Sequence, residues 1–303
     1  MQNSEIENAK RTIRRRVSGR LGFTVIAFAA MLAVCRPAHA VDRGKVLVIL
    51  SSANELELRD GKRFKTGFYL DELVIPLRKL AAAGFTPVFA NPKGNAATMA
   101  PDSNNKMFFG GDEAARADAV RYADGLAGLK HPKPFSDIVR AGTGDYVGVF
   151  VPGGHAPLED LVQDRNLGKI LTAFHATGRP TAVLCHGPVA LVSTVSDPEG
   201  FRRALIAGDL QTTSKLAAGW PFAGYRLTVF SSEEEVAVEK LVGGRVLFNP
   251  ADALSEAGAH VDHVAAFHPN VVQDREVVSG QQPFSSDELG DAFVAKLRAT
   301  ASR

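Results

Sequence analysis

The sequence predicts an α/β fold: a doubly wound, mostly parallel sheet with helices on both faces and an inserted cap segment. Strand-length apolar runs alternate along the chain with segments of helical periodicity, the order expected of βαβ units. These runs are apolar at successive positions rather than at alternate ones, which is typical of strands buried on both faces. Both observations favour a parallel sheet that is covered by helices on each side.

The first part of this pattern covers residues 45–90. Lys45–Leu50 is predicted to be a buried strand, and a polar loop over residues 51–67 follows it. Residues 70–84 have helical spacing, with Gly84 as a natural C-cap. The apolar run 85–90 is then the second strand, in βαβ order.

Pro76 lies inside the helical segment 70–84. Because proline has no N–H to donate, it leaves the carbonyl of Glu72 unpaired. We therefore expect Glu72 at or just before the start of the regular helix. This places its carboxylate at a βα loop, on the side of the sheet where such folds form their sites.

Residues 91–140 fit the alternating pattern least well. They contain several prolines and glycines and a helical patch around residues 112–129. A stretch of this length between strands indicates an elaborated lid or cap rather than a bare loop. His131 lies within it and is expected to be a surface histidine.

The remaining elements follow the same order. The predicted elements are strand 146–151, amphipathic helix 158–177, strand 181–184, strand 225–230, hairpin 271–278 and closing helix 285–297, with Ser285 or Ser286 as N-cap. Residues 233–235 are three consecutive glutamates after a strand. Taken alone, they indicate a helix N-terminus favoured by the helix dipole.

Cys185 stands where the strand 181–184 ends and a predicted helix starts near Pro188. Such an abrupt turn exposes its residue above the sheet, as in the nucleophile elbow. A helix N-terminus would lower the pKa of the thiol, and His186 supplies an adjacent base and a backbone N–H. The alternative is that Cys185 is a small buried hydrophobic residue. A second glycine-rich turn, Val151-Pro-Gly-Gly-His155, ends the preceding strand one βαβ unit earlier and favours the elbow.

The N-terminus has the order of a secretory signal peptide: a basic segment, an apolar run over residues 21–34 and the small-x-small site Ala38-His39-Ala40. The apolar run is short for a membrane span, which takes about 20 residues. We therefore expect cleavage after Ala40, a periplasmic or secreted protein without stable membrane association, and a single domain over residues 41–303. A lipoprotein box at Cys35 is disfavoured, because valine precedes the cysteine where a small residue is expected.

Composition restricts the partners. The 303 residues are 45% hydrophobic and 22% charged, which is ordinary for a globular protein. Residues 1–40 hold seven Lys/Arg and two Asp/Glu, leaving 28 basic and 31 acidic residues and a net charge of −3. We therefore expect no nucleic-acid partner. Cys185 is the only cysteine after residue 40, which excludes an intramolecular disulfide there.

Five motifs in this order resemble the ThiJ/PfpI superfamily, which has the flavodoxin-like, class I glutamine amidotransferase-like fold. The resemblance is closest to the glyoxalase III and heat-shock-chaperone branch and covers residues 43–300. The motifs are Asp71-Glu-Leu-Val-Ile-Pro76, Phe150-Val-Pro-Gly-Gly-His155, Leu184-Cys-His-Gly-Pro188, Thr228-Val-Phe-Ser-Ser-Glu-Glu-Glu235 and Ser279-Gly-Gln-Gln-Pro283. The cysteine elbow together with Gly-Gly-His is the specific part, and the other motifs support it.

The resemblance implies a role for each matching residue. Cys185 would be the nucleophile and His186 its general base. Glu235 matches the acid of the triad, with Glu234 as the alternative if the loop shifts by one residue. Glu72 matches the glutamate that hydrogen-bonds the cysteine.

Further positions would bind the substrate and stabilise an oxyanion. Gly154 and the His186 N–H would form the oxyanion hole, while His155 and Gly187 would line the pocket. Some relatives carry a metal site, but no matching His/Glu spacing is present here. The resemblance therefore implies no cofactor and no metal, and by analogy it suggests a homodimer.

The implied activity is that of a glutathione-independent glyoxalase, or D-lactate dehydratase. A Cys185 thiolate would add to a 2-oxoaldehyde such as methylglyoxal, and the resulting hemithioacetal would become a hydroxy acid. A Cys-His-Glu site does not distinguish this chemistry from that of an amidase, peptidase or deglycase. A holding chaperone and a thiol redox sensor are non-enzymatic alternatives on the same fold.

Overall fold

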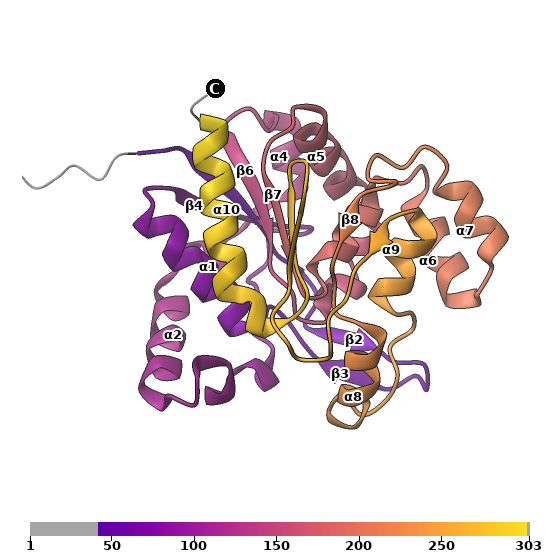
Figure 1. Cartoon of the computed structure of the whole chain (residues 1–303), viewed down its shortest axis with the longest axis horizontal. Helices are drawn as coiled ribbons and strands as arrows, with labels where there is room; N and C mark the ends of the chain where they lie inside the picture. Colours follow the sequence, from indigo (N-terminus) through magenta and orange to yellow (C-terminus); the bar gives the residue numbers. More distant parts are fainter. Residues whose placement is uncertain (1–41, 302–303) are drawn as a thin grey trace, which may run out of the picture. The chain divides into compact units, whose positions relative to one another are not determined.

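The computed structural model describes residues 42–301 of the chain (Figure 1). The predicted signal peptide at residues 1–40 and Cys35 lie outside this range. Cleavage after Ala40 and the absence of a lipid anchor at Cys35 therefore stay predictions. Within the described residues, no helix combines the length and the apolar character that a membrane crossing requires.

The predicted doubly wound sheet is confirmed. In residues 42–301 the main sheet has seven strands in the order β10-β11-β7-β6-β1-β4-β5, all parallel to their neighbours except the edge strand β10. Its strands are β1 (Lys45–Ile49), β4 (Thr86–Asn91), β5 (Lys133–Pro134), β6 (Tyr146–Val151), β7 (Thr181–Leu184), β10 (Val271–Asp274) and β11 (Val277–Gly280).

Helices cover both faces of this sheet (Figure 1). Their bounds are α1 (Leu70–Ala82), α2 (Glu113–Gly125), α3 (Ala127–Lys130), α4 (Phe135–Ala141), α5 (Arg165–Ala176), α6 (Pro198–Ala207), α7 (Leu210–Leu216), α8 (Ser232–Val242), α9 (Pro250–Ala257) and α10 (Ser286–Ala301). Val46 and Val48 of β1 belong to the core cluster of α1 and α10, whereas Leu47 and Ile49 belong to that of α5. Residues 46–49 of the central strand β1 are therefore apolar at successive positions, because both faces of the strand are buried.

Three predicted elements differ in the structure. The helix expected over residues 158–177 begins only at Arg165, because the Asp164 carboxylate accepts hydrogen bonds from the N–H groups of Asn166 and Leu167, both at 2.8 Å. The preceding residues form two 3₁₀ turns. The polar loop 51–67 contains a small hairpin of β2 (Glu55–Glu57) and β3 (Arg63–Lys65).

The strand expected over residues 225–230 is reduced to β8 (Arg226–Leu227). It pairs with β9 (His260–Val261) and not with the main sheet. The reason is visible at Thr228, whose N–H donates to the Ser279 side-chain oxygen at 2.9 Å instead of to a neighbouring strand. The hairpin over residues 271–278 is confirmed, and the closing helix begins at Ser286.

The first turn of α1 contains Glu72. The helix begins at Leu70, two residues before the position expected from Pro76, which the helix accommodates in its interior. Glu72 is still at the carboxyl end of the sheet, after β1, and it is fully buried.

The segment 91–140 divides into two parts. Two 3₁₀ turns, Pro101–Ser103 and Lys106–Phe109, come first, and α2 to α4 with the short edge strand β5 follow. The later part extends the sheet and covers it. The 3₁₀ turns contribute to the wall of a cavity described below. His131 is exposed, as expected.

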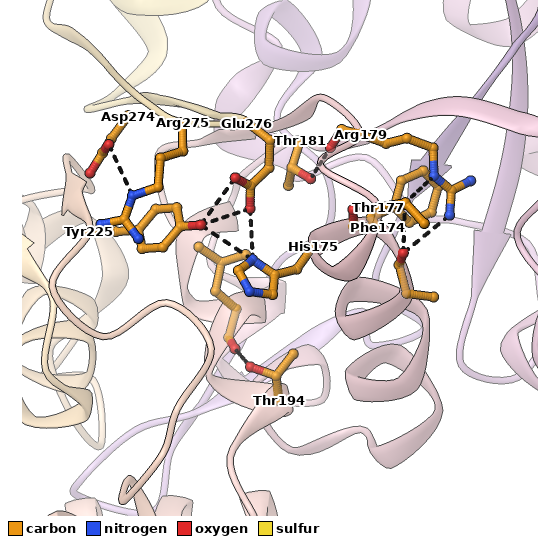
Figure 2. Close-up of polar contacts among 12 residues, drawn as sticks. Phe174, His175, Thr177, Arg179, Thr181, Thr194, Tyr225, Asp274, Arg275 and Glu276 are labelled. Atoms are coloured by element: carbon orange, nitrogen blue, oxygen red, sulfur yellow. Dashed lines mark hydrogen bonds and ion pairs between the residues drawn. The ribbon is translucent and has the colours of Figure 1, made fainter. Parts of the chain in front are cut away.

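A polar cluster closes the sheet at its amino end (Figure 2). His175, near the end of α5, has its Nδ1 2.8 Å from Oε1 of Glu276, in the turn between β10 and β11. The Tyr225 hydroxyl donates to both Glu276 oxygens at 3.1 Å, and the guanidinium carbon of Arg275 lies 3.7 Å from the centre of the Tyr225 ring. The contact between His175 and Glu276 thus connects the turn between β10 and β11 to helix α5.

Candidate active site

Cys185 occupies a strained turn directly after β7. Its φ is 58°, in the left-handed region that residues with a side chain rarely adopt. A 3₁₀ helix, Gly187–Thr194, follows, with Pro188 near its start. Strain of this kind costs about 1–3 kcal/mol and persists only where the surroundings enforce it. The geometry is that of the predicted nucleophile elbow.

The elbow depends on close contact with the turn after β6. A Cβ atom built on Gly153 would lie 2.5 Å from the Cβ of Cys185, and one on Gly187 would lie 2.4 Å from the Val151 carbonyl oxygen. Contacts under 3.0 Å are essentially never seen for real Cβ atoms, so only glycine fits at these positions. This explains why both turns are rich in glycine.

A Cys-His-Glu line runs through the site. Sγ of Cys185 is 3.2 Å from Nδ1 of His186, and Nε2 of His186 is 2.8 Å from Oε1 of Glu235. All three side chains are buried. Donation from Nε2–H to the Glu235 carboxylate leaves the Nδ1 lone pair facing the thiol, the arrangement that a general base requires.

Between the two candidate acids, the geometry favours Glu235. Both lie in the first turn of α8. Glu234 forms a capping box with Ser231, and its Oε1 accepts a hydrogen bond from the Phe267 N–H at 2.8 Å. It is therefore engaged in holding the helix start and the loop around Phe267, while Glu235 alone reaches His186.

His155 packs beside the base. Its ring centre is 4.2 Å from that of His186, and its Nε2 is 3.6 Å from Oε2 of Glu235. In residues 42–301, the group that could hold a metal ion is His155, His186 and Glu235, whose ligand atoms lie within 4.8 Å of one another. A metal there would take the place of the His186–Glu235 hydrogen bond.

Burial and neighbouring acids hold the Glu72 carboxyl in its neutral form. Its Oε2 accepts a hydrogen bond from the Gly153 N–H at 2.9 Å. Burial, reinforced by the adjacent Asp71, raises the pKa of Glu72 well above its usual range, and burial also raises the pKa of Asp71 to about 8. A protonated Glu72 can donate a hydrogen bond toward the sulfur.

The expectation of a lowered thiol pKa is wrong. Burial raises the pKa of Cys185 well above its usual value, and the neighbouring Glu72 adds to the shift. The N–H of Gly154 hydrogen-bonds the sulfur and opposes the shift, but does not outweigh it. The side chain is only 3% exposed, and the helix that follows is a 3₁₀ helix. The free site therefore holds a thiol rather than a thiolate.

The other two residues of the Cys-His-Glu line, His186 and Glu235, differ in charge. Burial, followed by the neighbouring His155, lowers the pKa of His186 to about 4. Burial opposes the ionisation of Glu235, but His186 and His155 outweigh it, and the pKa of Glu235 falls to about 2. At neutral pH the site thus contains a neutral imidazole held by a carboxylate.

A cavity of about 420 Å³ opens above these groups, with Cys185, His186, Gly154 and His155 at its base. Its walls are mostly apolar side chains from elements far apart in sequence. They include Tyr69, Phe108, Phe230, Phe267 and Phe284, together with Val238 and Leu241 of α8. Four of the seven predicted site residues line the cavity: Cys185, His186, Gly154 and His155. The other three do not line it. Gly187 lies in the elbow, and Glu72 and Glu235 contact Cys185 and His186.

Several wall residues were not predicted. Asp102 and Phe108 come from the 3₁₀ turns of the segment 91–140, and Phe267 comes from the loop before β10. An available signal was the apolar group Met107-Phe108-Phe109 in an otherwise polar stretch. Asp102 gave no signal, because a single aspartate beside a proline is normally a turn residue.

Comparisons with known proteins identify similar sequences. The model of the DJ-1/PfpI family matches residues 64–196. The protein/nucleic acid deglycase HchA of Pseudomonas aeruginosa (strain UCBPP-PA14) is 27% identical over 269 residues, covering 86% of this chain and 82% of that protein. HchA of Staphylococcus aureus (strain bovine RF122 / ET3-1) is 28% identical over 268 residues, with the same coverage.

Solved structures show the same fold. Glyoxalase III from Candida albicans superposes with a TM-score of 0.63 at 22% identity, covering 84% of this chain and 98% of that chain. The Rapid Encystment Protein 24 kDa of Francisella tularensis has a TM-score of 0.61 at 19% identity, covering 84% and 99%. At these identities the similarity establishes the architecture alone.

Proposed function

We propose that this chain, which the DJ-1/PfpI family model matches over residues 64–196, is a cysteine-dependent enzyme that hydrates 2-oxoaldehydes such as methylglyoxal to 2-hydroxy acids. The observation that carries the proposal is the line Cys185–His186–Glu235 at the base of a cavity, with the cysteine held at φ 58°. Strained left-handed residues that carry a side chain cluster at functional sites.

The first step is addition of the thiol to the aldehyde carbon. Because the free site holds a neutral thiol and a neutral imidazole, Nδ1 of His186 takes the proton as the carbon–sulfur bond forms. The charged Glu235 stabilises the imidazolium that results. The Gly154 N–H, which hydrogen-bonds the sulfur, and the His186 N–H are the proposed donors to the oxygen of the hemithioacetal.

The following steps need no external oxidant or reductant. The imidazolium of His186 first gives the thiol's proton to the hemithioacetal oxygen and becomes neutral again. His186 then takes the proton of the former aldehyde carbon and passes it to the ketone oxygen, which gives an enediol. Transfer of the hydroxyl proton on the former aldehyde carbon to the former ketone carbon then gives a hydroxyacyl thioester on Cys185. The aldehyde carbon is thereby oxidised and the ketone carbon reduced. Water then hydrolyses the thioester, so that the sum is one 2-oxoaldehyde plus one water giving one 2-hydroxy acid.

Glu72 would act on the sulfur. Its raised pKa keeps it protonated at neutral pH, so it can hydrogen-bond the thiolate during addition and departure without repelling it. Ionised, the same carboxyl would disfavour the thiolate.

Deglycase activity is a second candidate, favoured by the similarity to the HchA relatives, which are named protein/nucleic acid deglycases. An adduct of methylglyoxal with an amine or a thiol would pass to Cys185 and then follow the same steps. Both reactions release the same hydroxy acid, and they differ in the leaving group and in the room it needs.

The test measures lactate formed from methylglyoxal by the purified, reduced protein without glutathione and in a chelating buffer. Cys185→Ser should reduce turnover about 10³-fold or more, because a nucleophile cannot be replaced by its neighbours. Its fold is checked by circular dichroism. If the folded wild-type protein has a reduced thiol and forms no lactate, or if Cys185→Ser keeps full activity, the proposal is wrong.

A further inference from the structure

Three buried side chains beside the reacting thiol have the composition of a metal site. His155, His186 and Glu235 are 6%, 1% and 4% exposed, and their ligand atoms lie within 4.8 Å of one another. Nε2 of His186 is 2.8 Å from Oε1 of Glu235, and Nε2 of His155 is 3.6 Å from Oε2. Two imidazoles and one carboxylate are a common ligand set for Zn²⁺ in proteins.

The Nε2 atom of His155 lacks a polar partner. It is buried and has no hydrogen bond to any residue that the structure describes. Its distance of 3.6 Å from Glu235 is too long for a hydrogen bond. A buried polar atom without a partner is costly, and an ion bound to it would remove that cost. Because Glu235 also holds His186, an ion at its carboxylate lies within reach of both rings.

The space between the three ligand atoms suits a metal ion better than a water molecule. Zn²⁺ lies about 2.0–2.2 Å from nitrogen and oxygen ligands, whereas a hydrogen-bonded water lies at roughly 2.8 Å. A gap that holds the ion therefore leaves almost no surface for water, as is the case at Nε2 of His155. Two atoms bound to one ion are at most about 4.2 Å apart, so separations within 4.8 Å need shifts of about 0.6 Å or less.

The surroundings favour a cation that accepts nitrogen ligands. His155 and His186 line the main cavity, and none of the described residues of that lining is Lys or Arg. A cation that approaches through the cavity therefore meets no positive side chain in the lining. Imidazole ligands suit zinc, whereas magnesium and calcium prefer sites made of oxygen atoms alone.

From this geometry we propose that Zn²⁺ binds between His155, His186 and Glu235 and inhibits the enzyme. The ion takes the lone pair of Nε2 of His186, so the ring proton moves from Nε2 to Nδ1. The Nδ1–H group then faces Sγ of Cys185, 3.2 Å away, and Nδ1 can no longer accept the thiol proton. No redox change and no net proton release accompany binding. Binding is independent of the proposed function, and only the inhibition rests on it.

Cys185 does not belong to this ligand set. Its sulfur lies at Nδ1 of His186, and the two nitrogens of an imidazole ring point away from each other. Thiolate is otherwise a preferred ligand of zinc, so the exclusion of Cys185 is a distinctive expectation. Cys185→Ser should leave the affinity for Zn²⁺ within about 3-fold, because the serine oxygen can accept the same hydrogen bond from Nδ1–H.

The experiment titrates the reduced protein, freed of metal by a chelator that is then removed, with ZnCl₂ in a calorimeter. We expect one Zn²⁺ per chain in the site. His155→Phe and Glu235→Gln each remove a ligand and should weaken this binding about 100-fold or more. Circular dichroism checks the fold, and the nearly isosteric Glu235→Gln maintains the test if His155→Phe does not fold. MgCl₂ should give no binding at the same concentrations.

A matched control variant is available at the second histidine–glutamate pair. Nδ1 of His175 is 2.8 Å from Oε1 of Glu276 (Figure 2). This pair has a single histidine and belongs to no group of three metal-ligating residues in residues 42–301. His175→Phe should therefore leave the affinity for Zn²⁺ within about 2-fold of the wild type.

A second measurement follows the base without requiring turnover. It is the rate at which iodoacetamide alkylates Cys185, read by mass spectrometry. Saturating Zn²⁺ should slow this reaction about 10-fold or more in the wild type, because Nδ1 of His186 no longer takes the thiol proton. The same concentration should leave the rate in His155→Phe within about 2-fold.

The outcomes separate this proposal from the proposed function. Zinc binding that Cys185→Ser abolishes would assign the ion to the thiol and overturn the proposal. Undiminished binding in both His155→Phe and Glu235→Gln would overturn it as well, and so would a wild type without saturable binding. An unchanged alkylation rate in the zinc-bound protein would refute the inhibition. A failure to form lactate in metal-free buffer would contradict only the proposed function.

Discussion

Two histidine–glutamate pairs stand at opposite ends of strand β7. At its carboxyl end, Nε2 of His186 is 2.8 Å from Glu235, and at its amino end Nδ1 of His175 is 2.8 Å from Glu276 (Figure 2). Glu235 and Glu276 are both buried. By distance and by residue type the two pairs are equivalent.

The difference lies in what the second ring nitrogen and the carboxylate face. His186 turns its Nδ1 to a cysteine at φ 58°, below a cavity. At the other pair, the Tyr225 hydroxyl donates to Glu276, and His175 is half-buried at the surface. A histidine–carboxylate pair is therefore no sign of catalysis in this fold. The strained nucleophile and the space above it carry the functional argument.

The sharpest test of this comparison is the same substitution at both ends. Glu235→Gln should lower kcat/KM for a 2-oxoaldehyde about 10²–10⁴-fold, the range of a general-base contribution, because the imidazole loses its tautomer and its countercharge. Glu276→Gln should leave kcat/KM within about 2-fold. Both are measured by initial rates at pH 7. A large loss in Glu276→Gln would contradict the division between a catalytic and a structural pair.

The pH dependence of kcat/KM provides a second test of the His186–Glu235 pair, with a smaller expected effect than the substitution of Glu235. The pKa of His186 is lowered to about 4 from its ordinary value of 6.5, mainly by burial, so the base stays neutral far into acid. Activity needs the neutral form and is lost as pH falls through the folded pKa. The acid limb of kcat/KM, which reports the free enzyme, should therefore lie near pH 4 and not near 6.5.

Glu235→Gln moves that limb in a defined direction. The carboxylate raises the pKa of His186, so removing its charge should move the limb further to acid in the residual activity. Because the unfolded chain binds a proton on His186 near pH 6.5 and the folded chain only near pH 4, stability falls as pH drops below 6.5. Circular dichroism at each pH therefore serves as the control. An acid limb near 6.5 in a folded enzyme would refute the neutral, buried base.

Much of the fold follows from periodicity alone. The buried strands β1, β4, β6 and β7 are continuous apolar runs, and the hairpin of β10 and β11 is evident from its composition. The strand expected over residues 225–230 is mostly irregular, because its N–H groups bind side chains such as Ser279. Local sequence cannot indicate that exchange of a strand partner for a side-chain oxygen.

The site was predictable where it is local. Cys185, His186 and the glycines beside them lie in turns whose geometry the sequence specifies. The choice between Glu235 and Glu234 depends on which carboxylate α8 turns toward His186, and a capping box settles that. The prediction for the thiol pKa has the wrong direction, because burial raises that pKa and Glu72, which lies far away in sequence, adds to the shift. Neither effect is evident from the residues next to Cys185.

The smallest expected effect concerns the structural pair. Glu276 accepts two hydrogen bonds from Tyr225 and lies 2.8 Å from His175, so Glu276→Gln should lower the free energy of unfolding by about 1–3 kcal/mol. Urea unfolding measures this, with Glu55→Gln, at an exposed position, as a control expected within about 0.5 kcal/mol of the wild type. Adding Tyr225→Phe should give less than the sum of the two single losses, because both changes remove the same bonds. Strict additivity would mean that the tyrosine and the glutamate do not stabilise the hairpin turn together.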